Sequence, residues 1–108
     1  DARRAALRLR ELGAQEVVVK LGASGALYLG DTSFHVPAFP VTPVDTTAAG
    51  DAFTAALAFA WQTLPRQDAV RFANAVGGLA TTVAGAQPSM PTYAAATAFL
   101  KEKGGLAP

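Results

Sequence analysis

The pattern of apolar and polar positions predicts a helix followed by short strands in the first part of the chain. Residues 2–12 place Leu7 and Leu12 on one helical face with arginines between them, and Gly13 is positioned to end that helix. Residues 16–21 follow with a continuous apolar, β-branched core. Such a run is typical of a strand that is covered on both faces.

A turn and two further strands complete this first part. Residues 22–25 are rich in glycine and predict a turn, and residues 26–29 predict a second strand. Residues 30–32 reverse the chain into residues 33–36, where apolar positions alternate, so one face of that strand is expected to be exposed. Proline favours an extended, poorly paired backbone, and three prolines follow: Pro37, Pro40 and Pro43.

The second part of the chain predicts helices. Residues 49–62 are apolar on nearly every side, as in a helix buried inside a larger body, and we expect Phe59 and Trp61 in the core. Residues 66–83 carry apolar side chains at helical spacing, with Phe72 also expected in the core.

Glycine and loop residues divide these helices. Gly77 and Gly78 weaken the middle helix and allow a close approach of backbones. Residues 85–91 predict a loop, and Thr92 is positioned to cap a last helix that reaches about Lys103. The order of helix, strands and helices predicts an α/β layer in a single segment, because no repeat, low-complexity tract or linker interrupts it.

Composition excludes several classes of protein. The 108 residues are 51% hydrophobic, which supports a packed core, and they contain no cysteine, which excludes a disulfide scaffold and fits a cytoplasmic protein. The formal net charge of +1 gives no general case for binding nucleic acid or a membrane surface. With no cysteine and a single histidine, His35, which we expect at the surface, a zinc site is not expected either.

Residues 45–53 (Asp-Thr-Thr-Ala-Ala-Gly-Asp-Ala-Phe) carry the candidate chemistry. They predict an extended segment that turns into a helix, whose first N–H groups lack internal partners and carry partial positive charge. Ala48, Ala49 and Gly50 have almost no side chains, so an anion could approach these N–H groups. Asp51 lies beside them and could accept a proton from an attacking hydroxyl. Spacing alone leaves a second interpretation open, an ordinary capped helix with an acidic first turn.

The same segment resembles the signature of the ribokinase, or PfkB-type, family of carbohydrate kinases. Residues 18–26 resemble the family's strand-turn-strand beside the nucleotide, residues 71–75 its helix beside the adenine, and residues 85–91 the cation loop of ribokinases. The segments occur in the family's order and cover nearly the whole chain. The resemblance implies an α/β fold: the C-terminal part of a three-layer α/β/α kinase, without its N-terminal half and lid.

The resemblance also implies roles for individual residues. Asp51 matches the catalytic base that meets the sugar hydroxyl, and Ala48, Ala49 and Gly50 match the anion hole for the transferred phosphoryl group. Lys20 stands where ribokinases often have threonine, so it either meets a phosphate or is solvated. The positions that match nucleotide-binding residues are Lys20, Gly22, Ala23, Ser24, Gly25, Gly50 and Asn74.

A monovalent cation site is implied next to the anion hole. Its matching ligands are the Asp45 side chain, the Ser89 hydroxyl and four backbone carbonyls, those of Thr47, Ala80, Val83 and Gly85. A set of oxygens that are mostly neutral suits a large, weakly charged ion, so K+ is expected as activator. Mg2+ would arrive with ATP, and no side chain of the chain is assigned to it.

The implied function is ATP-dependent phosphorylation of a sugar's primary hydroxyl by the parent protein, with D-ribose to ribose 5-phosphate as the leading reaction. Fructokinase and 2-keto-3-deoxygluconate kinase are the alternatives within the family, although residues 87–89 favour ribokinase. A non-catalytic nucleotide- or partner-binding module is the alternative outside enzymes, against which Asp51 argues. We expect the 108 residues alone to be inactive or nearly so, and the sugar and a homodimeric state of the parent stay open.

Overall fold

The computed structural model of the protein describes residues 1–84 and 91–105, and the chain divides after Ala38 into two units. The sequence shows no linker at this point. The division falls between Pro37 and Pro40, where the chain is in neither a helix nor a strand, because proline cannot donate a ladder hydrogen bond.

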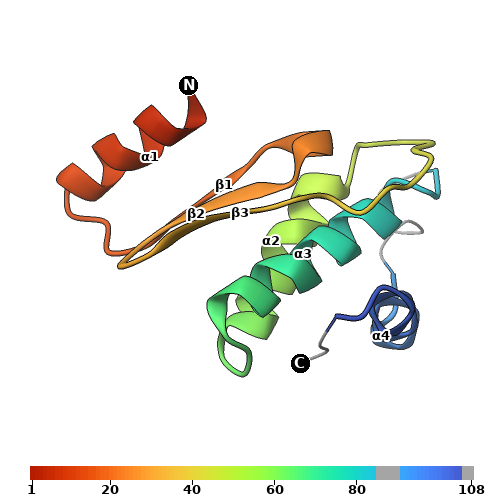
Figure 1. Cartoon of the computed structure of the whole chain (residues 1–108). Helices are drawn as coiled ribbons and strands as arrows, with labels where there is room; N and C mark the ends of the chain where they lie inside the picture. Colours follow the sequence, from red (N-terminus) through yellow and green to blue (C-terminus); the bar gives the residue numbers. More distant parts are fainter. Residues whose placement is uncertain (85–90, 106–108) are drawn as a thin grey trace. The chain divides into compact units, whose positions relative to one another are not determined.

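The first unit contains a helix and a small antiparallel sheet (Figure 1). Strand β2 lies between β1 and β3, and Val17 pairs with Leu29 while Ala26 pairs with Val36. The predicted helix, strands and turn are confirmed to within two residues at each end. In chain order the elements are α1 (Ala2–Glu11), β1 (Val17–Lys20), the 3-10 turn η1 (Gly22–Ser24), β2 (Ala26–Leu29) and β3 (Ser33–Val36).

Helix α1 buries a smaller residue than the sequence pattern predicts. Leu7 and Leu12 are 47% and 67% exposed, whereas Ala6 is fully buried. The methyl side chain of Ala6 allows the helix backbone to come close to the sheet. The cluster around Ala6 consists of Val17, Leu27 and Leu29. The helix ends where predicted, and Gly13 follows its C-cap with a φ of +114°.

Strand β1 is not covered on both faces along its length. Val17 is buried, but Val18 and Val19 are only half-buried and Lys20 is exposed. Strand β2, with its shorter apolar run, is buried at all four positions. The reason is the order of the sheet, in which β1 is an edge and β2 is the centre. A continuous apolar run does not distinguish these two places.

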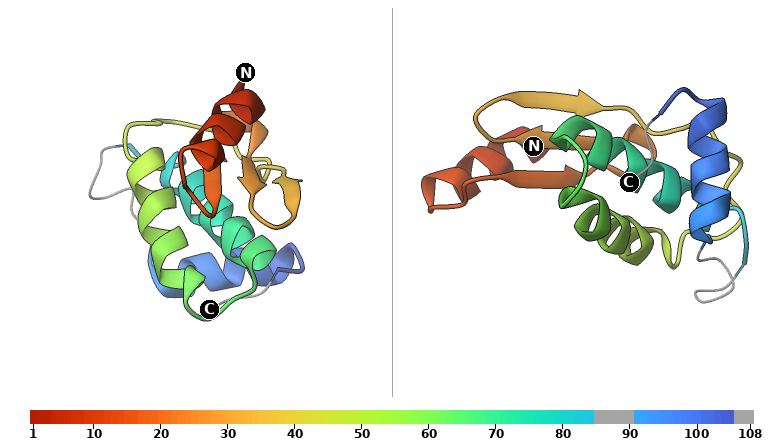
Figure 2. Two further views of the ribbon diagram at one scale, coloured as in Figure 1. Left: turned by 90° about the vertical axis from the view of Figure 1, so that its left-hand side faces the viewer. Right: turned by 90° about the horizontal axis from the view of Figure 1, so that it is seen from below.

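The second unit consists of an extended segment and three helices. They are α2 (Ala49–Trp61), α3 (Arg66–Ala80) and α4 (Tyr93–Glu102). Helices α2 and α3 lie side by side in both views of Figure 2. A Cβ atom added at Gly77 would lie 3.3 Å from the carbonyl oxygen of Ala49 and 3.4 Å from Cβ of Phe53. The close approach of backbones predicted for Gly77 is therefore confirmed.

The ends of the helices follow local hydrogen bonds. Helix α3 ends at Ala80, before the predicted end at residue 83. The hydroxyls of Thr81 and Thr82 donate to the carbonyls of Gly78 and Leu79, both at 2.7 Å. Such bonds compete with the backbone bonds that would continue the helix. Helix α4 begins as predicted, because the Thr92 hydroxyl accepts a hydrogen bond from the Ala95 amide at 3.1 Å.

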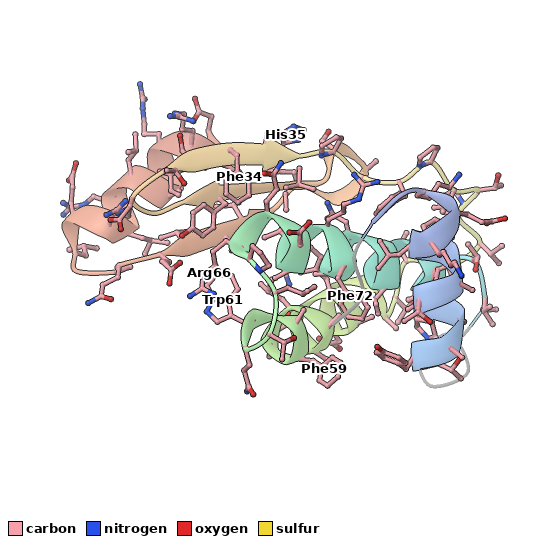
Figure 3. All side chains as sticks on the ribbon, turned by 60° about the horizontal axis from the view of Figure 1, so that its bottom comes forward. Phe34, His35, Phe59, Trp61, Arg66 and Phe72 are labelled. Atoms are coloured by element: carbon pink, nitrogen blue, oxygen red, sulfur yellow. The ribbon has the colours of Figure 1, made fainter. Side chains whose placement is uncertain are left out.

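The three aromatic residues expected in the core have different surroundings (Figure 3). Phe72 is buried, as predicted, but Phe59 is 57% exposed and Trp61 is half-buried. Helix α2 turns a stripe of small residues and Phe53 inward, so Phe59 falls on another side, with its ring 6.2 Å from that of Tyr93. The prediction of a core position is therefore wrong for Phe59.

Trp61 has a specific contact at the loop between α2 and α3. The guanidinium carbon of Arg66 lies 3.7 Å from the centre of the Trp61 ring, and Arg66 Nη1 donates to the Trp61 carbonyl at 3.2 Å. This pair fastens the end of α2 to the start of α3. None of the helices in the described parts of the chain is long and apolar enough to cross a membrane.

Candidate active site

The segment before α2 is anchored to the end of α3. The amides of Val44 and Asp45 both donate to the carbonyl of Thr81, at 2.6 and 2.9 Å. Thr81 is itself buried, and it is the C-cap of α3. The backbone at Asp45 is thereby held beside the residue that follows Ala80, so two segments predicted to supply cation ligands lie next to each other.

The Asp45 carboxylate shapes the turn into α2. Its Oδ1 accepts hydrogen bonds from the Thr47 amide, at 2.9 Å, and from the Thr47 hydroxyl. An aspartate that bonds the backbone two residues ahead closes a turn of its own. Asp45 therefore fixes the path of the chain as it reaches Ala48, and its Oδ1 is already bonded to groups of this turn.

Helix α2 begins without a side-chain cap. Its N-cap is Ala48, which has no side chain that could accept a hydrogen bond from the first turn. The side-chain cap of the alternative interpretation is therefore missing, although its acidic first turn is present in Asp51. Helices α1 and α4 are capped by Asp1 and Thr92, whereas α3, like α2, has no side-chain cap. The partial positive charge at the start of α2 is not used by a capping side chain.

The amides of Ala48 and Ala49 differ in their hydrogen bonding. Within the described residues, the Ala48 amide makes no hydrogen bond, although Ala48 is only 4% exposed. The Ala49 amide donates to the Thr46 carbonyl at 3.2 Å, so it is not free as the sequence suggested. An anion at this site would have to share or replace that bond. Of these two amides, that of Ala48 is the less engaged donor of the predicted anion hole.

Asp51 occupies the first turn of α2, and its side chain is exposed. It is not packed into the protein. The helix start therefore presents an anion-attracting end and, a residue or two further on, a carboxylate that is accessible to a substrate. This combination can hold a phosphoryl group and accept a proton from a nearby hydroxyl.

The turn predicted to meet a nucleotide lies in the first unit. The Leu21 amide donates to the Gly25 carbonyl at 2.8 Å, and the Gly25 amide donates to the Gly22 carbonyl at 3.1 Å. Gly25 has a φ of +92°, and a Cβ atom there would lie 2.0 Å from the Val36 carbonyl oxygen. Only glycine fits that position without a shift of the backbone. Lys20, just before the turn, is exposed.

His35 contacts this turn, which the sequence did not predict. Its Nε2 lies 2.6 Å from the Ser24 carbonyl oxygen. The signal that could have found the contact is the register of the hairpin, since pairing of Ala26 with Val36 brings the end of β3 beside the turn. His35 is exposed, as expected, but it is not an isolated surface residue.

The other predicted site residues lie in the second unit. Asn74 is buried on α3, Ala80 is the last residue of that helix, and Val83 is exposed after it. Gly85 and Ser89, the remaining predicted cation ligands, lie outside the described residues, as does most of the predicted loop at residues 85–91.

Comparison with known proteins gives the class of protein. The model of the pfkB family of carbohydrate kinases matches residues 1–93. The chain therefore belongs to the pfkB family of carbohydrate kinases, as its motifs indicated.

The individual relatives are named for several different activities. Aminoimidazole riboside kinase of Salmonella typhimurium is 41% identical over 90 residues, which are 77% of this chain and 28% of the relative. The structure of Arabidopsis thaliana ribokinase complexed with ribose and ATP is 36% identical, with a TM-score of 0.87, over 92% of this chain and 33% of that one. A double mutant of fructokinase from Vibrio cholerae O395, in a form with bound fructose, ADP and potassium ion, is 36% identical with a TM-score of 0.81. The match covers 91% of this chain and 34% of that one.

These matches confirm the predicted fold class. The helices and the small sheet match part of the ribokinase-like α/β fold, and the chain spans about a third of the length of its relatives. The relatives are kinases of sugars or sugar-like compounds, and their names differ in the acceptor. The roles of Asp51, the anion hole, the nucleotide-binding residues and the cation ligands stay predictions.

Proposed function

We propose that the protein containing this chain transfers the γ-phosphoryl group of ATP to the primary hydroxyl of a sugar. The observation that supports the proposal best is the start of α2, which has no side-chain cap. Its Ala48 amide makes no hydrogen bond within the described residues, and the exposed Asp51 carboxylate is close to it in the sequence. The chain supplies the anion hole, the base and part of the nucleotide site.

The proposed chemistry uses the two properties of this helix start. The sugar hydroxyl oxygen forms a bond to the γ-phosphorus, the bond from that phosphorus to the β–γ bridging oxygen breaks, and ADP leaves. The hydroxyl proton passes to the Asp51 carboxylate. The N–H groups at Ala48, Ala49 and Gly50 face the charge on the transferred group, and positioning with charge stabilisation provides most of the acceleration.

The residues proposed to contact the nucleotide are small or polar. Residues 22–24 of the turn are exposed and allow close approach of phosphate or ribose, whereas Gly25 is buried. Lys20 adds a positive charge, and Asn74 is proposed beside the adenine. Mg2+ bound together with ATP would supply neutralisation of phosphate charge, and no described side chain is assigned to hold it.

We propose D-ribose as the acceptor, with ribose 5-phosphate as product, and fructose as the second candidate. Both sugars occur in complexes of related kinases. The test is to supply the full-length gene product with ATP, Mg2+ and one of four acceptors: ribose, fructose, aminoimidazole riboside or 2-keto-3-deoxygluconate. ADP release and 31P NMR of the product identify the acceptor. Binding of ATP without turnover of any acceptor would favour the non-catalytic module instead.

Activity is expected to depend on K+. Potassium chloride should support about 10-fold faster turnover than sodium chloride at equal ionic strength, because a bound cation would order the turn between Asp45 and Ala48. The anchoring of Asp45 to Thr81, next to Ala80, fits such a site. Steady-state rates in the two salts measure the effect.

Asp45→Asn should remove most of this preference for K+, since it removes the charged oxygen from the proposed ligand set. Asp31→Asn is a suitable control, because Asp31 is an exposed residue of the β2–β3 turn. Equal rates in both salts for the unchanged protein would contradict the cation site.

A further inference from the structure

The contact between His35 and Ser24 has a defined direction. The Ser24 carbonyl oxygen can only accept a hydrogen bond, so His35 Nε2 carries the proton and donates it over 2.6 Å. Both the neutral ring with its proton on Nε2 and the doubly protonated ring can donate in this way. The contact therefore does not require one particular charge on the histidine.

His35 adds a side-chain hydrogen bond to the backbone bonds of the turn. The carbonyls of Leu21, Gly22 and Gly25 accept backbone amides from within the turn. The Ser24 carbonyl accepts the histidine instead. His35 thus contributes a side-chain bond to the backbone of this turn.

The end of the turn at Gly25 is held by a second feature, its close approach to the backbone at Val36 and Ala38. The Cα of Gly25 is pressed so closely against the chain after β3 that an added Cβ would lie 2.0 Å from the Val36 carbonyl oxygen and 2.7 Å from the Ala38 amide nitrogen. Gly25 thus fixes the end of the turn against β3. His35, which lies on the same strand (Figure 3), holds the peptide unit between Ser24 and Gly25 through its bond to the Ser24 carbonyl.

We propose that His35 is a positioning residue for the nucleotide, which holds the turn at residues 22–25 in the form that meets ATP. The inference rests on the proposed function, in which this turn contacts the nucleotide. His35 itself need not touch ATP, since it acts through the Ser24 carbonyl. Loss of the bond would leave that carbonyl free to rotate, and the turn would have to be ordered when ATP binds.

The test compares two variants of the full-length gene product. His35→Leu removes the donor at similar size, whereas His35→Gln places an N–H donor at the same number of bonds from the backbone. His35→Leu should raise both the KM for ATP and the Kd for ATP about 5-fold, the effect of one hydrogen bond. His35→Gln should restore both to within about 2-fold of the unchanged protein. In both variants kcat and the KM for the sugar should stay within about 2-fold, because the reacting groups are untouched.

If His35 only stabilised the fold, its variants would not change the ATP constants selectively. Thermal unfolding of both variants, with Ser33→Ala on the same strand as control, reports any loss of stability, and such a loss would affect the sugar and ATP constants alike. Unchanged ATP constants in His35→Leu, or equal losses in His35→Leu and His35→Gln, would overturn the role of His35 alone. Failure of the unchanged protein to bind ATP, measured by titration calorimetry, would overturn the proposed function and this inference with it.

Discussion

Replacing Asp51 with asparagine in the full-length gene product is expected to lower kcat by about 10²- to 10⁴-fold, the usual contribution of a positioned general base. Asparagine keeps the size of the side chain and cannot take up the hydroxyl proton. The exposed position of Asp51 in the first turn of α2 makes a loss of folding a minor concern. Steady-state kinetics with varied ATP and sugar should show the loss in kcat, with both KM values little changed.

Asp68→Asn is the matched control, because Asp68 also occupies the first turn of a helix, α3, without a proposed part in the reaction. It should leave kcat within about 2-fold of the unchanged protein, since surface substitutions away from a site have small effects. Turnover by Asp51→Asn within about 10-fold of the unchanged protein would remove Asp51 from the role of base.

Gly25→Ala is expected to have the largest effect on folding. At a φ of +92° any side chain is strained, and the new Cβ would also lie 2.0 Å from the Val36 carbonyl oxygen, which belongs to backbone and cannot swing away. Strain and overpacking together should cost at least about 3 kcal/mol in the free energy of unfolding. Urea denaturation followed by circular dichroism measures this loss through the midpoint.

Gly13→Ala separates the two causes. Gly13 has a φ of +114° in the same unit, but nothing lies within 4 Å of an added Cβ. Its substitution should cost about 1–2 kcal/mol from backbone strain alone. If the two variants lost the same stability, the close contact between Gly25 and Val36 would not be the reason that glycine is needed there.

The sequence predicted most of the elements because the groups that begin and end them lie close to them along the chain. Gly13 ends α1 and Thr92 starts α4 through groups that lie within a few residues of each helix end. The end of α3 was missed because the Thr81 and Thr82 hydroxyls compete with the backbone bonds, which propensity does not count.

Features that depend on contacts distant in sequence could not be predicted in this way. The exposure of Phe59 depends on which stripe of α2 packs on α3, and an all-apolar helix offers several stripes. The bond from His35 to Ser24 follows from strand register. For the candidate site, spacing and family motifs named the residues, whereas the bond of the Ala49 amide to Thr46 required the coordinates.

Gly77 has a consequence for grafting residues 45–51, the proposed phosphate-binding segment, onto another scaffold. The Ala49 carbonyl, which would lie 3.3 Å from a Cβ added at Gly77, belongs to the same rigid peptide unit as the Gly50 N–H. The lack of a side chain at Gly77 therefore leaves the room that this peptide unit occupies beside α3. A transplant of residues 45–51 alone would lack this neighbour, so the part of α3 around Gly77 has to be included in the graft.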